Sequence, residues 1–390
     1  MRKYLLLTVL VSVSSLLLFW SPYIFKSSKL WGIEFGPSDK SFHPGISTIV
    51  QNFDGINFLV VAKSWYNPIL IRQNFAEILD FREELYFSAH YPLFPIVISV
   101  FDMLTSGPNA LILAILFSNI VLAATLFIFF SEILPEKREK IAFILSCVSL
   151  FFPPRILSDR VVGSNEPLFI SLVLLSLVMS SKGKHLWAAI LGSLAVLTRS
   201  PGILLFAAYF LSVIATKEQV LKDKLKLIAM YSLIPLTLLA LWAFYGIRFG
   251  SFFSYFQVGG NINLVFPAFM VFADNQKWVS GLWLEDILFT FTYISLGVLQ
   301  LKSVLKDNLG RYSTVLFGGI YLLTTFFIVH RDIARYSLPI APIALAGLYP
   351  FLLNAKNLKY LGLLIVPLYL LAWHFVNHNL QPISDWTNLL

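Results

Sequence analysis

The chain has 390 residues, of which 57% are hydrophobic and only 13% are charged, and its mean hydropathy is +0.76. A soluble domain is roughly 45–50% apolar and about 25% charged, so this composition excludes an ordinary water-soluble protein. The net charge of +8 does not indicate nucleic-acid binding, because most of the basic residues are lysines in short predicted loops. The single cysteine, Cys147, lies in an apolar run and argues against disulfides and cysteine-based zinc sites.

Most of the surface must therefore face lipid, where the backbone satisfies its own hydrogen bonds in helices or in a closed barrel. The apolar runs are continuous over roughly 15–22 residues and do not alternate, which favours helices. The sequence predicts an all-α polytopic membrane protein, one domain over residues 1–390, with about eleven transmembrane helices. The predicted helices are 4–25, 109–130, 141–157, 167–181, 186–198, 201–215, 227–246, 287–301, 312–329, 337–353 and 360–376.

The N-terminal segment resembles a signal peptide, but its apolar stretch is long and no small-residue cleavage site follows it. It is expected to remain as the first helix, and Arg2 and Lys3 predict a cytoplasmic N-terminus. The segments that then face the cytoplasm carry more than half of the 29 lysine and arginine residues, in agreement with the positive-inside rule. These segments are the N-terminus and the loops 131–140, 182–185, 216–226, 302–311 and 354–359.

The opposite, non-cytoplasmic face receives the long connections. They include a first loop at 26–107, expected to contain interfacial helices, and a second long loop at 247–286. Within the first loop, residues 91–104 are apolar but short and contain Asp102, so they predict an interfacial or re-entrant helix. Long and chemically varied loops on one face indicate a functional site there.

Two residues of the first long loop are candidates for this site. Asp54 begins a predicted short helix at 53–66, and one interpretation is that it simply caps that helix. The alternative is that a carboxylate at the lipid boundary removes a proton from an acceptor hydroxyl. His90, in the sequence HYPLFP, is either an interfacial surface residue or a donor to a phosphate or sugar oxygen.

Four arginines are predicted at the outer ends of helices. Arg155 follows two prolines, and Arg199 stands in the break of a long apolar stretch. Arg331 and Arg335 are four residues apart and share one face if their segment is helical, with Asp332 available to pair with either. Arginine cannot deprotonate in a protein, and its planar fork suits phosphate oxygens. A lipid phosphate is therefore the natural counter-anion for this group of arginines.

Two further residues have ordinary interpretations. Glu166, in the sequence Ser-Asn-Glu-Pro, is typical of a membrane-helix start with a cap and a proline in the first turn. Tyr336 is typical of an interfacial aromatic residue. The alternative is that both contact a bound substrate beside the arginines.

Together and in order, five blocks resemble the GT-C superfamily of polyprenyl-phosphate-sugar glycosyltransferases. The closer resemblance is to its PIG-V-type branch, the GPI mannosyltransferase 2-like proteins. The blocks are Phe53-Asp54-Gly55, Tyr91-Pro92-Leu93-Phe94-Pro95, Ser164-Asn165-Glu166-Pro167-Leu168-Phe169, Arg199-Ser200-Pro201-Gly202 and Arg335-Tyr336. Phe53 stands where the family usually has Trp, Phe94 stands where it usually has Tyr, and the loop 247–286 has no match.

The resemblance implies transfer of a sugar, expected to be mannose, with inversion from a polyprenyl or dolichyl phosphate donor. The acceptor would be a hydroxyl of a lipid-linked or extracytoplasmic molecule. Asp54 is the predicted catalytic base. The residues predicted to contact the donor phosphate or substrate are His90, Tyr91, Arg155, Glu166, Arg199, Arg331, Arg335 and Tyr336.

No Asp-x-Asp motif is present, so no essential metal and no other cofactor are expected. The predicted partners are the donor, the acceptor and membrane lipids, without nucleic acid. The protein would lie in the plasma membrane of a prokaryote or the ER membrane of a eukaryote, with its site on the non-cytoplasmic face.

The alternative polytopic class is a lipid or solute transporter or flippase. Such a protein would show related halves, broken helices at the midplane and buried ionisable groups there. The sequence instead has one oversized outer loop and charges near predicted helix ends. A non-enzymatic scaffold would give no reason for the outer arginines, so the sequence favours a glycosyltransferase.

Overall fold

The computed structural model describes residues 1–27, 29–30, 32–35, 45–79, 82–134, 139–216, 220–258, 264–273, 279–304, 309–381, 383 and 386–390. This part of the chain is all-α apart from one small hairpin, so the prediction of an all-α protein is confirmed. The hairpin pairs β1 (Lys29–Leu30) with β2 (Ile33–Glu34) in antiparallel register.

Five stretches of helix are long and apolar enough to cross a membrane, as expected of an integral multi-pass membrane protein. They are α1 (Arg2–Ile24), α7 (Gly107–Ile133), α13 (Leu221–Tyr231) with α14 (Leu233–Phe249), α16 (Gly281–Val304) and α21 (Ala355–Leu363) with α22 (Ile365–Asn377). A sixth span results if α8 (Glu139–Ser149) and α9 (Pro154–Arg160) are one broken span. The predicted total of about eleven spans stays a prediction.

Shorter helices stand beside these spans or connect them. The ones with ten or more residues are α3 (Gly55–Ser64), α6 (Leu93–Asp102), α10 (Glu166–Ser181), α11 (His185–Val196), α12 (Leu204–Ala215) and α17 (Leu309–Thr325). The remaining elements are α2 (Ser47–Val50), α4 (Pro68–Asn74), α5 (Ala76–Leu79), η1 (Glu84–Ala89), η2 (Ser200–Ile203), α15 (Ser254–Gln257), η3 (Met270–Ala273), α18 (Ile333–Tyr336), η4 (Leu338–Ile340), α19 (Ala341–Gly347) and α20 (Tyr349–Leu352).

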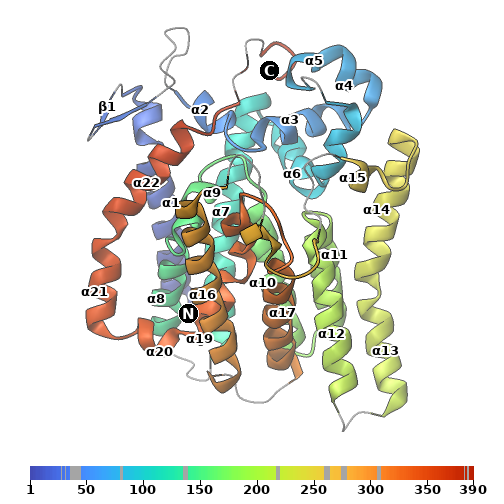
Figure 1. Ribbon diagram of the computed structural model, residues 1–390, viewed down its shortest axis with the longest axis vertical. Helices are drawn as coiled ribbons and strands as arrows, with labels where there is room; N and C mark the ends of the chain where they lie inside the picture. Colours follow the sequence, from blue (N-terminus) through green and yellow to red (C-terminus); the bar gives the residue numbers. More distant parts are fainter. Residues whose placement is uncertain are drawn as a thin grey trace.

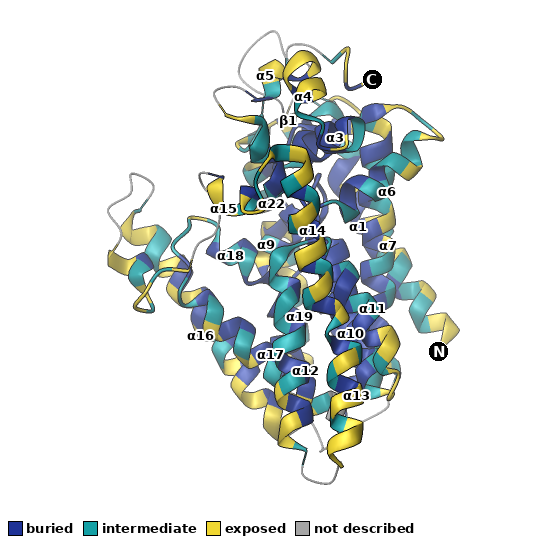
Figure 2. Ribbon diagram, turned by 90° about the vertical axis from the view of Figure 1, so that its right-hand side faces the viewer, coloured by how far each residue is buried: buried dark blue, intermediate teal, exposed yellow. Residues whose placement is uncertain are grey.

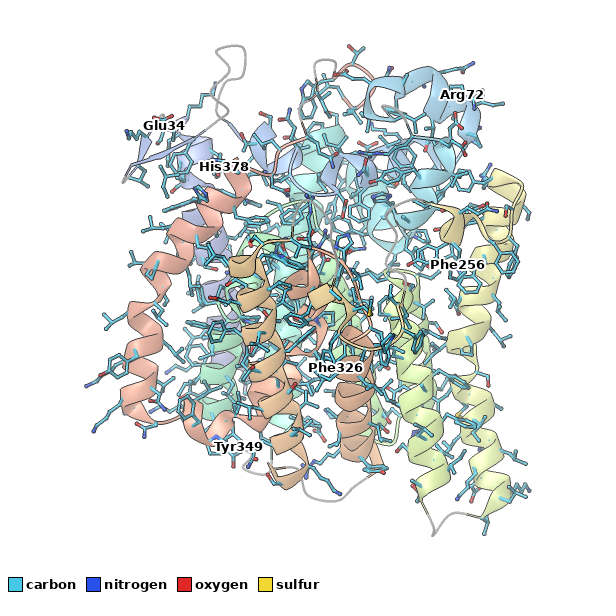
Figure 3. The ribbon with its side chains drawn as sticks, viewed as in Figure 1. Glu34, Arg72, Phe256, Phe326, Tyr349 and His378 are labelled. Atoms are coloured by element: carbon cyan, nitrogen blue, oxygen red, sulfur yellow. The ribbon has the colours of Figure 1, made fainter. Side chains whose placement is uncertain are left out.

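The two ends of the bundle carry different parts of the chain. The N-terminus and α20 lie at one end, and the elements of the first long loop lie with the C-terminus at the other (Figure 1). Figure 3 marks the same division, with Tyr349 at one end and Glu34 and Arg72 at the other. At the N-terminal end, Lys182 lies 3.6 Å from Glu132. Glu132 and Lys182, from two of the loops predicted on the cytoplasmic side, therefore lie at the same end.

The predicted helix 141–157 is wrong as a single helix. It is divided into α8 and α9, which are bent by 76° at the break. Pro153 and Pro154 lack backbone N–H groups, and a proline disfavours helical geometry in the residue before it, so the helix ends ahead of them. Arg155 consequently begins a new helix, whereas the sequence placed it at the outer end of the preceding one.

The helices of the first long loop are packed into the structure. Most residues of α3 are buried, and the helix is mainly dark blue in Figure 2, although the sequence predicted a helix lying at the membrane surface. The ten residues of α6 rise about 15 Å, which is half of the roughly 30 Å of a bilayer core, so this helix is too short to span. The backbone N–H of Leu93, the first residue of α6, donates to the carbonyl oxygen of Leu197 at the end of α11, at 2.9 Å.

Two glycines bring the start of α3 against the turn before α10. A Cβ atom on Gly163 would lie 2.4 Å from the Cα atom of Gly55, so a side chain at either position would push the two backbones apart. The Asn52 side chain donates to Val376 O at 2.8 Å and fixes the same segment to α22. These contacts hold Asp54 close to the first residue of α10.

Candidate functional site

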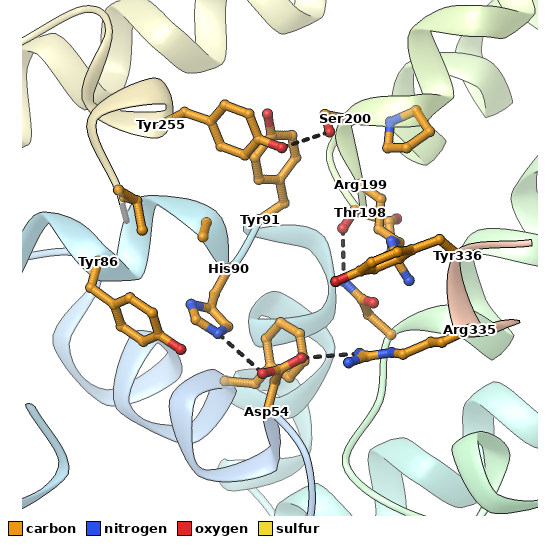
Figure 4. Close-up of a pocket in the computed structure, with 15 residues that line it drawn as sticks. Asp54, Tyr86, His90, Tyr91, Thr198, Arg199, Ser200, Tyr255, Arg335 and Tyr336 are labelled. Carbon is orange, nitrogen blue, oxygen red and sulfur yellow. Dashed lines mark hydrogen bonds and ion pairs between the residues drawn. The ribbon is translucent and has the colours of Figure 1, made fainter. Parts of the chain in front are cut away.

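A cavity of about 160 Å³ lies where α3, η1, η2 and α18 meet, at the end of the bundle that carries the first long loop (Figure 4). Six of the nine predicted site residues line it, and they come from four separate parts of the sequence. These six are Asp54, His90, Tyr91, Arg199, Arg335 and Tyr336.

Asp54 occupies the N-cap position of α3, but its side chain makes no capping hydrogen bond. Its Oδ2 atom accepts from Arg335 Nη2 at 3.0 Å, and its Oδ1 atom lies 3.6 Å from His90 Nε2. The carboxylate is 29% exposed and opens on the cavity. The cap interpretation therefore does not describe the side chain.

The charged state of Asp54 follows from its neighbours. Burial by itself would raise the pKa of Asp54, but the Arg335 guanidinium and His90 outweigh it and hold this pKa well below its ordinary value. Asp54 is thus ionised at neutral pH and is able to accept a proton.

Glu166 lies behind the cavity wall and has no exposed surface. Arg335 holds it with two N–H groups, from Nε to Oε1 at 2.6 Å and from Nη2 to Oε2 at 3.2 Å. Arg199 pairs with the same Oε1 atom, and the Ser164 hydroxyl donates to Oε2. Glu166 does not line the cavity; its carboxylate fixes the two guanidiniums that do.

These four residues form a neutral cluster, defined here as the Asp54 cluster: Asp54, Glu166, Arg199 and Arg335. Two carboxylates balance two guanidiniums, which is how buried charges are accommodated in a medium of low dielectric constant. Figure 4 shows Asp54 and His90 on one side of the cavity and Arg199 with Tyr336 on another. The Tyr336 ring lies 5.6 Å from the Arg199 guanidinium carbon.

The rest of the cavity wall is aromatic and polar, and much of it was not predicted. The Tyr255 and Ser200 hydroxyls lie 3.0 Å apart, and the Tyr255 ring packs at 5.4 Å on that of the predicted Tyr91. The Tyr86 ring packs at 5.1 Å on His90. The other unpredicted lining residues are Phe58, Ala89, Asn165, Thr198, Pro201 and Val258.

Of these unpredicted residues, Tyr86 could have been found from the sequence, whereas Tyr255 could not. Tyr86 stands four residues before His90 in the same loop, and that proximity could have identified it. Tyr255 lies in the loop where the family resemblance has no match, so only the fold reveals it.

Two predicted site residues, Arg155 and Arg331, line a second cavity of about 770 Å³, between α16 and α22. Arg155 pairs with Asp332 at 3.1 Å, so the expected pairing of Asp332 with Arg331 or Arg335 is wrong. Because α18 begins at Ile333, Arg331 lies outside the helix. Its side chain is exposed while that of Arg335 is buried, and the two do not share a face.

No fully buried charge was predicted beside Arg155, yet both Asp159 and Arg160 are fully buried. Arg160 donates to Leu150 O at 2.9 Å and to Asn119 Oδ1 at 3.0 Å. These bonds tie α9 to the end of α8 and to α7, which is a structural role. Among the described residues, no three His, Cys, Asp or Glu side chains are grouped so as to hold a metal ion.

Solved structures with this arrangement of helices exist. One is the archaeal oligosaccharyltransferase AglB from Archaeoglobus fulgidus, solved in complex with an inhibitory peptide and a dolichol-phosphate. The match covers 99% of this chain and 57% of the AglB chain, with a TM-score of 0.55 and 12% identity. Another is ArnT from Cupriavidus metallidurans, bound to undecaprenyl phosphate. The match covers 93% of this chain and 63% of the ArnT chain, with a TM-score of 0.57 and 11% identity.

A second Archaeoglobus fulgidus oligosaccharyltransferase structure, tethered to an acceptor peptide containing the NVT sequon, gives a TM-score of 0.54 at 14% identity, with 99% of this chain and 56% of that chain covered. The chain thus spans less than two thirds of the length of these proteins. A scan against protein-family models finds no match, and neither does a search of curated proteins. Identities this low show the fold alone, and that fold is similar to those of AglB and ArnT.

Proposed function

We propose that the chain is a membrane glycosyltransferase that moves a sugar from a polyprenyl or dolichyl phosphate to a hydroxyl group. Mannose is the expected sugar, and a lipid-linked or extracytoplasmic molecule is the expected acceptor. The observation that carries the proposal is the Asp54 cluster at a cavity, where the ionised Asp54 carboxylate pairs with Arg335 and a second guanidinium, that of Arg199, also lines the wall. The fold shared with proteins solved with dolichol-phosphate and undecaprenyl phosphate supports it.

The proposed chemistry needs few groups, because a sugar linked to a phosphate already has a good leaving group. The acceptor oxygen attacks the anomeric carbon, the bond to the phosphate oxygen breaks, and the acceptor proton passes to Asp54. The phosphate gains one negative charge while Asp54 loses one, so the total charge in the site is unchanged. General-base catalysis of this kind contributes about 10²–10⁴ in rate.

Inversion requires the base and the leaving group on opposite faces of the sugar. Arg335 touches Asp54 directly, so Arg199, across the cavity from Asp54, is the better ligand for the leaving phosphate (Figure 4). A phosphate on the Arg199 side would also attract Arg335 and weaken its bond to Asp54. The carboxylate would then become a stronger base only when the donor is in place.

The test is a transfer assay with the purified chain in lipid. A polyprenyl-phosphate-mannose labelled in the sugar is expected to yield a labelled product only when an acceptor fraction is added, with inverted anomeric configuration by NMR. Donors carrying glucose or aminoarabinose establish the sugar preference. Loss of label from one leaflet with the phosphate bond intact would instead indicate the transporter class.

The proposed site faces the non-cytoplasmic side, and cysteine labelling tests that orientation. In a variant in which Cys147 is replaced, Lys184→Cys is expected to be shielded from an impermeant thiol reagent in right-side-out membranes, and Lys29→Cys is expected to react. The opposite pattern would place the cavity on the cytoplasmic side.

A further inference from the structure

Arg155 uses two different nitrogen atoms to bridge two carboxylates. Its Nε atom lies 3.2 Å from Asp159 Oδ1, within α9, and its Nη2 atom lies 3.1 Å from Asp332 Oδ1, just ahead of α18. Asp159 has no exposed surface, and Arg155 is only 16% exposed. These three residues are called the Arg155 latch below.

The Arg155 latch contacts the two segments that carry Asp54 and Arg335, which form an ion pair at the first cavity. Asp332 stands three residues before Arg335, so its bond to Arg155 holds the start of α18 against α9. On the other side, the Arg155 guanidinium carbon lies 5.2 Å from the ring of Phe53, the residue before Asp54. The Arg335 guanidinium carbon lies 4.9 Å from the same ring. Phe53 is therefore packed between the latch and the ion pair.

A phosphate-binding role suits Arg155 poorly. Its guanidinium already lies between two carboxyl groups, and a phosphate placed there would meet the negative charge of Asp332. Its open face is also covered, since the Phe375 ring centroid lies 3.8 Å from the guanidinium carbon. In the Asp54 cluster, by contrast, each carboxylate is matched by a cation.

We propose that Arg155 is a positioning residue, which sets the distance between Asp54 and Arg335 through Phe53 and Asp332. This inference rests on the proposed transferase function for its kinetic test. A displacement of about 1 Å at a reacting pair is enough to cost on the order of 10²-fold in rate, so a latch of this kind controls turnover without touching substrate.

The experiment separates a positioning role from phosphate binding by their opposite consequences. Asp332→Asn breaks the latch but leaves Arg155 free to bind a phosphate. We expect the transfer rate to fall about tenfold or more, with the donor dissociation constant changed by less than about twofold. Asp332→Glu restores the charge and is expected to recover part of the rate. If Arg155 were a phosphate ligand, Asp332→Asn would bind donor as well or better and keep its rate, which would overturn the proposal.

Two further variants complete the design. Arg155→Lys keeps the charge, but a single ammonium cannot lie against both carboxyl groups as the two guanidinium nitrogens do, so a loss of rate between those of the parent and Asp332→Asn is expected. Weaker donor binding without a loss of rate would contradict positioning. Asp286→Asn is the matched control, since Asp286 is an exposed carboxylate on the wall of the same second cavity. It is expected to keep the parental rate.

A readout that does not depend on turnover distinguishes failure of the latch from failure of the proposed function. Arg155→Gln, Asp332→Asn and the double variant form a thermodynamic cycle in thermal unfolding. Non-additive shifts of the unfolding midpoint are expected, because both single changes break the same bond. Additive shifts would overturn the latch even if the parent transfers sugar. An inactive parent with non-additive shifts would remove the transferase proposal and leave the contact standing.

Discussion

The segment that carries Arg331 and Arg335 lines both cavities, and the cavities differ in how they hold their arginines. In the smaller cavity, Arg335 is buried and bound to two carboxylates that come from distant parts of the chain. In the larger cavity, Arg331 is exposed at a mostly apolar wall. In the sequence, these two arginines look equivalent. The difference shows that the neighbouring carboxylates, more than the position at a helix end, decide what an arginine does.

The largest effect is expected from Glu166→Gln, which would leave two buried guanidiniums with one carboxylate between them. Breaking a buried ion pair from one side costs about 3–5 kcal/mol, and the free energy of unfolding should fall by that amount. Denaturant or thermal unfolding in mixed micelles measures it. Glu139→Gln, at an exposed pair with the N-terminus, is the control and should change stability by no more than about 1 kcal/mol. Equal losses for the two variants would show that the Asp54 cluster has no special role in the fold.

Asp54→Asn is expected to lower the transfer rate by about 10²-fold or more, because an amide cannot accept the acceptor proton at neutral pH. Since the side chain makes no capping bond, the stability of α3 should not depend on such a bond. Donor binding should survive, because the arginines are the proposed phosphate ligands. Asp54→Glu should keep partial activity. A stable Asp54→Asn variant that binds donor and transfers at the parental rate would place the base elsewhere.

Arg199→Lys is expected to weaken donor binding by about tenfold, or about 1.4 kcal/mol, because it keeps the charge but loses the planar fork. Isothermal titration with the polyprenyl phosphate product reports this directly. Arg199→Ala should cost more, about 2–4 kcal/mol, which is the scale for losing one partner of a close charge pair. Unchanged affinity in both variants would return Arg199 to a structural role beside Glu166.

Arg331→Gln tests the other half of the comparison, which is the exposed arginine of the larger cavity. An exposed side chain is screened by solvent, so the transfer rate and the donor affinity should each change by less than about threefold. A larger loss of donor affinity would move the phosphate into the second cavity.

The smallest effect concerns pH. Because the pKa of Asp54 is depressed in the folded protein, the carboxylate stays ionised from neutral pH down to below its ordinary value of about 3.9. Its contribution to stability is present above that ordinary value and is lost only as the pH falls through the folded pKa. Protonation of Asp54 should therefore cause no loss of transfer rate between pH 7 and 5. An acidic limb in that range that disappears in Asp54→Glu would contradict this.

Local pattern was enough to predict several features of this protein. Continuous apolar runs predicted the helices, and Glu132 and Lys182, from two of the loops expected on one side, do lie together at one end of the bundle. Six of the nine predicted site residues meet at one cavity because they stand at helix ends that share the other end of the bundle. Periodicity and composition act over a few residues, so they are readable without the fold.

The partners of the charged residues were decided only by the tertiary structure. Asp54 and Arg335 are 281 residues apart in the sequence, and Arg155 and Asp332 are 177 apart. Which carboxylate meets which guanidinium depends on how the helix ends converge, and in particular on the close approach of Gly55 and Gly163. A buried charge must find a partner, but sequence pattern does not indicate which one, because the electrostatic energy depends on distances in space.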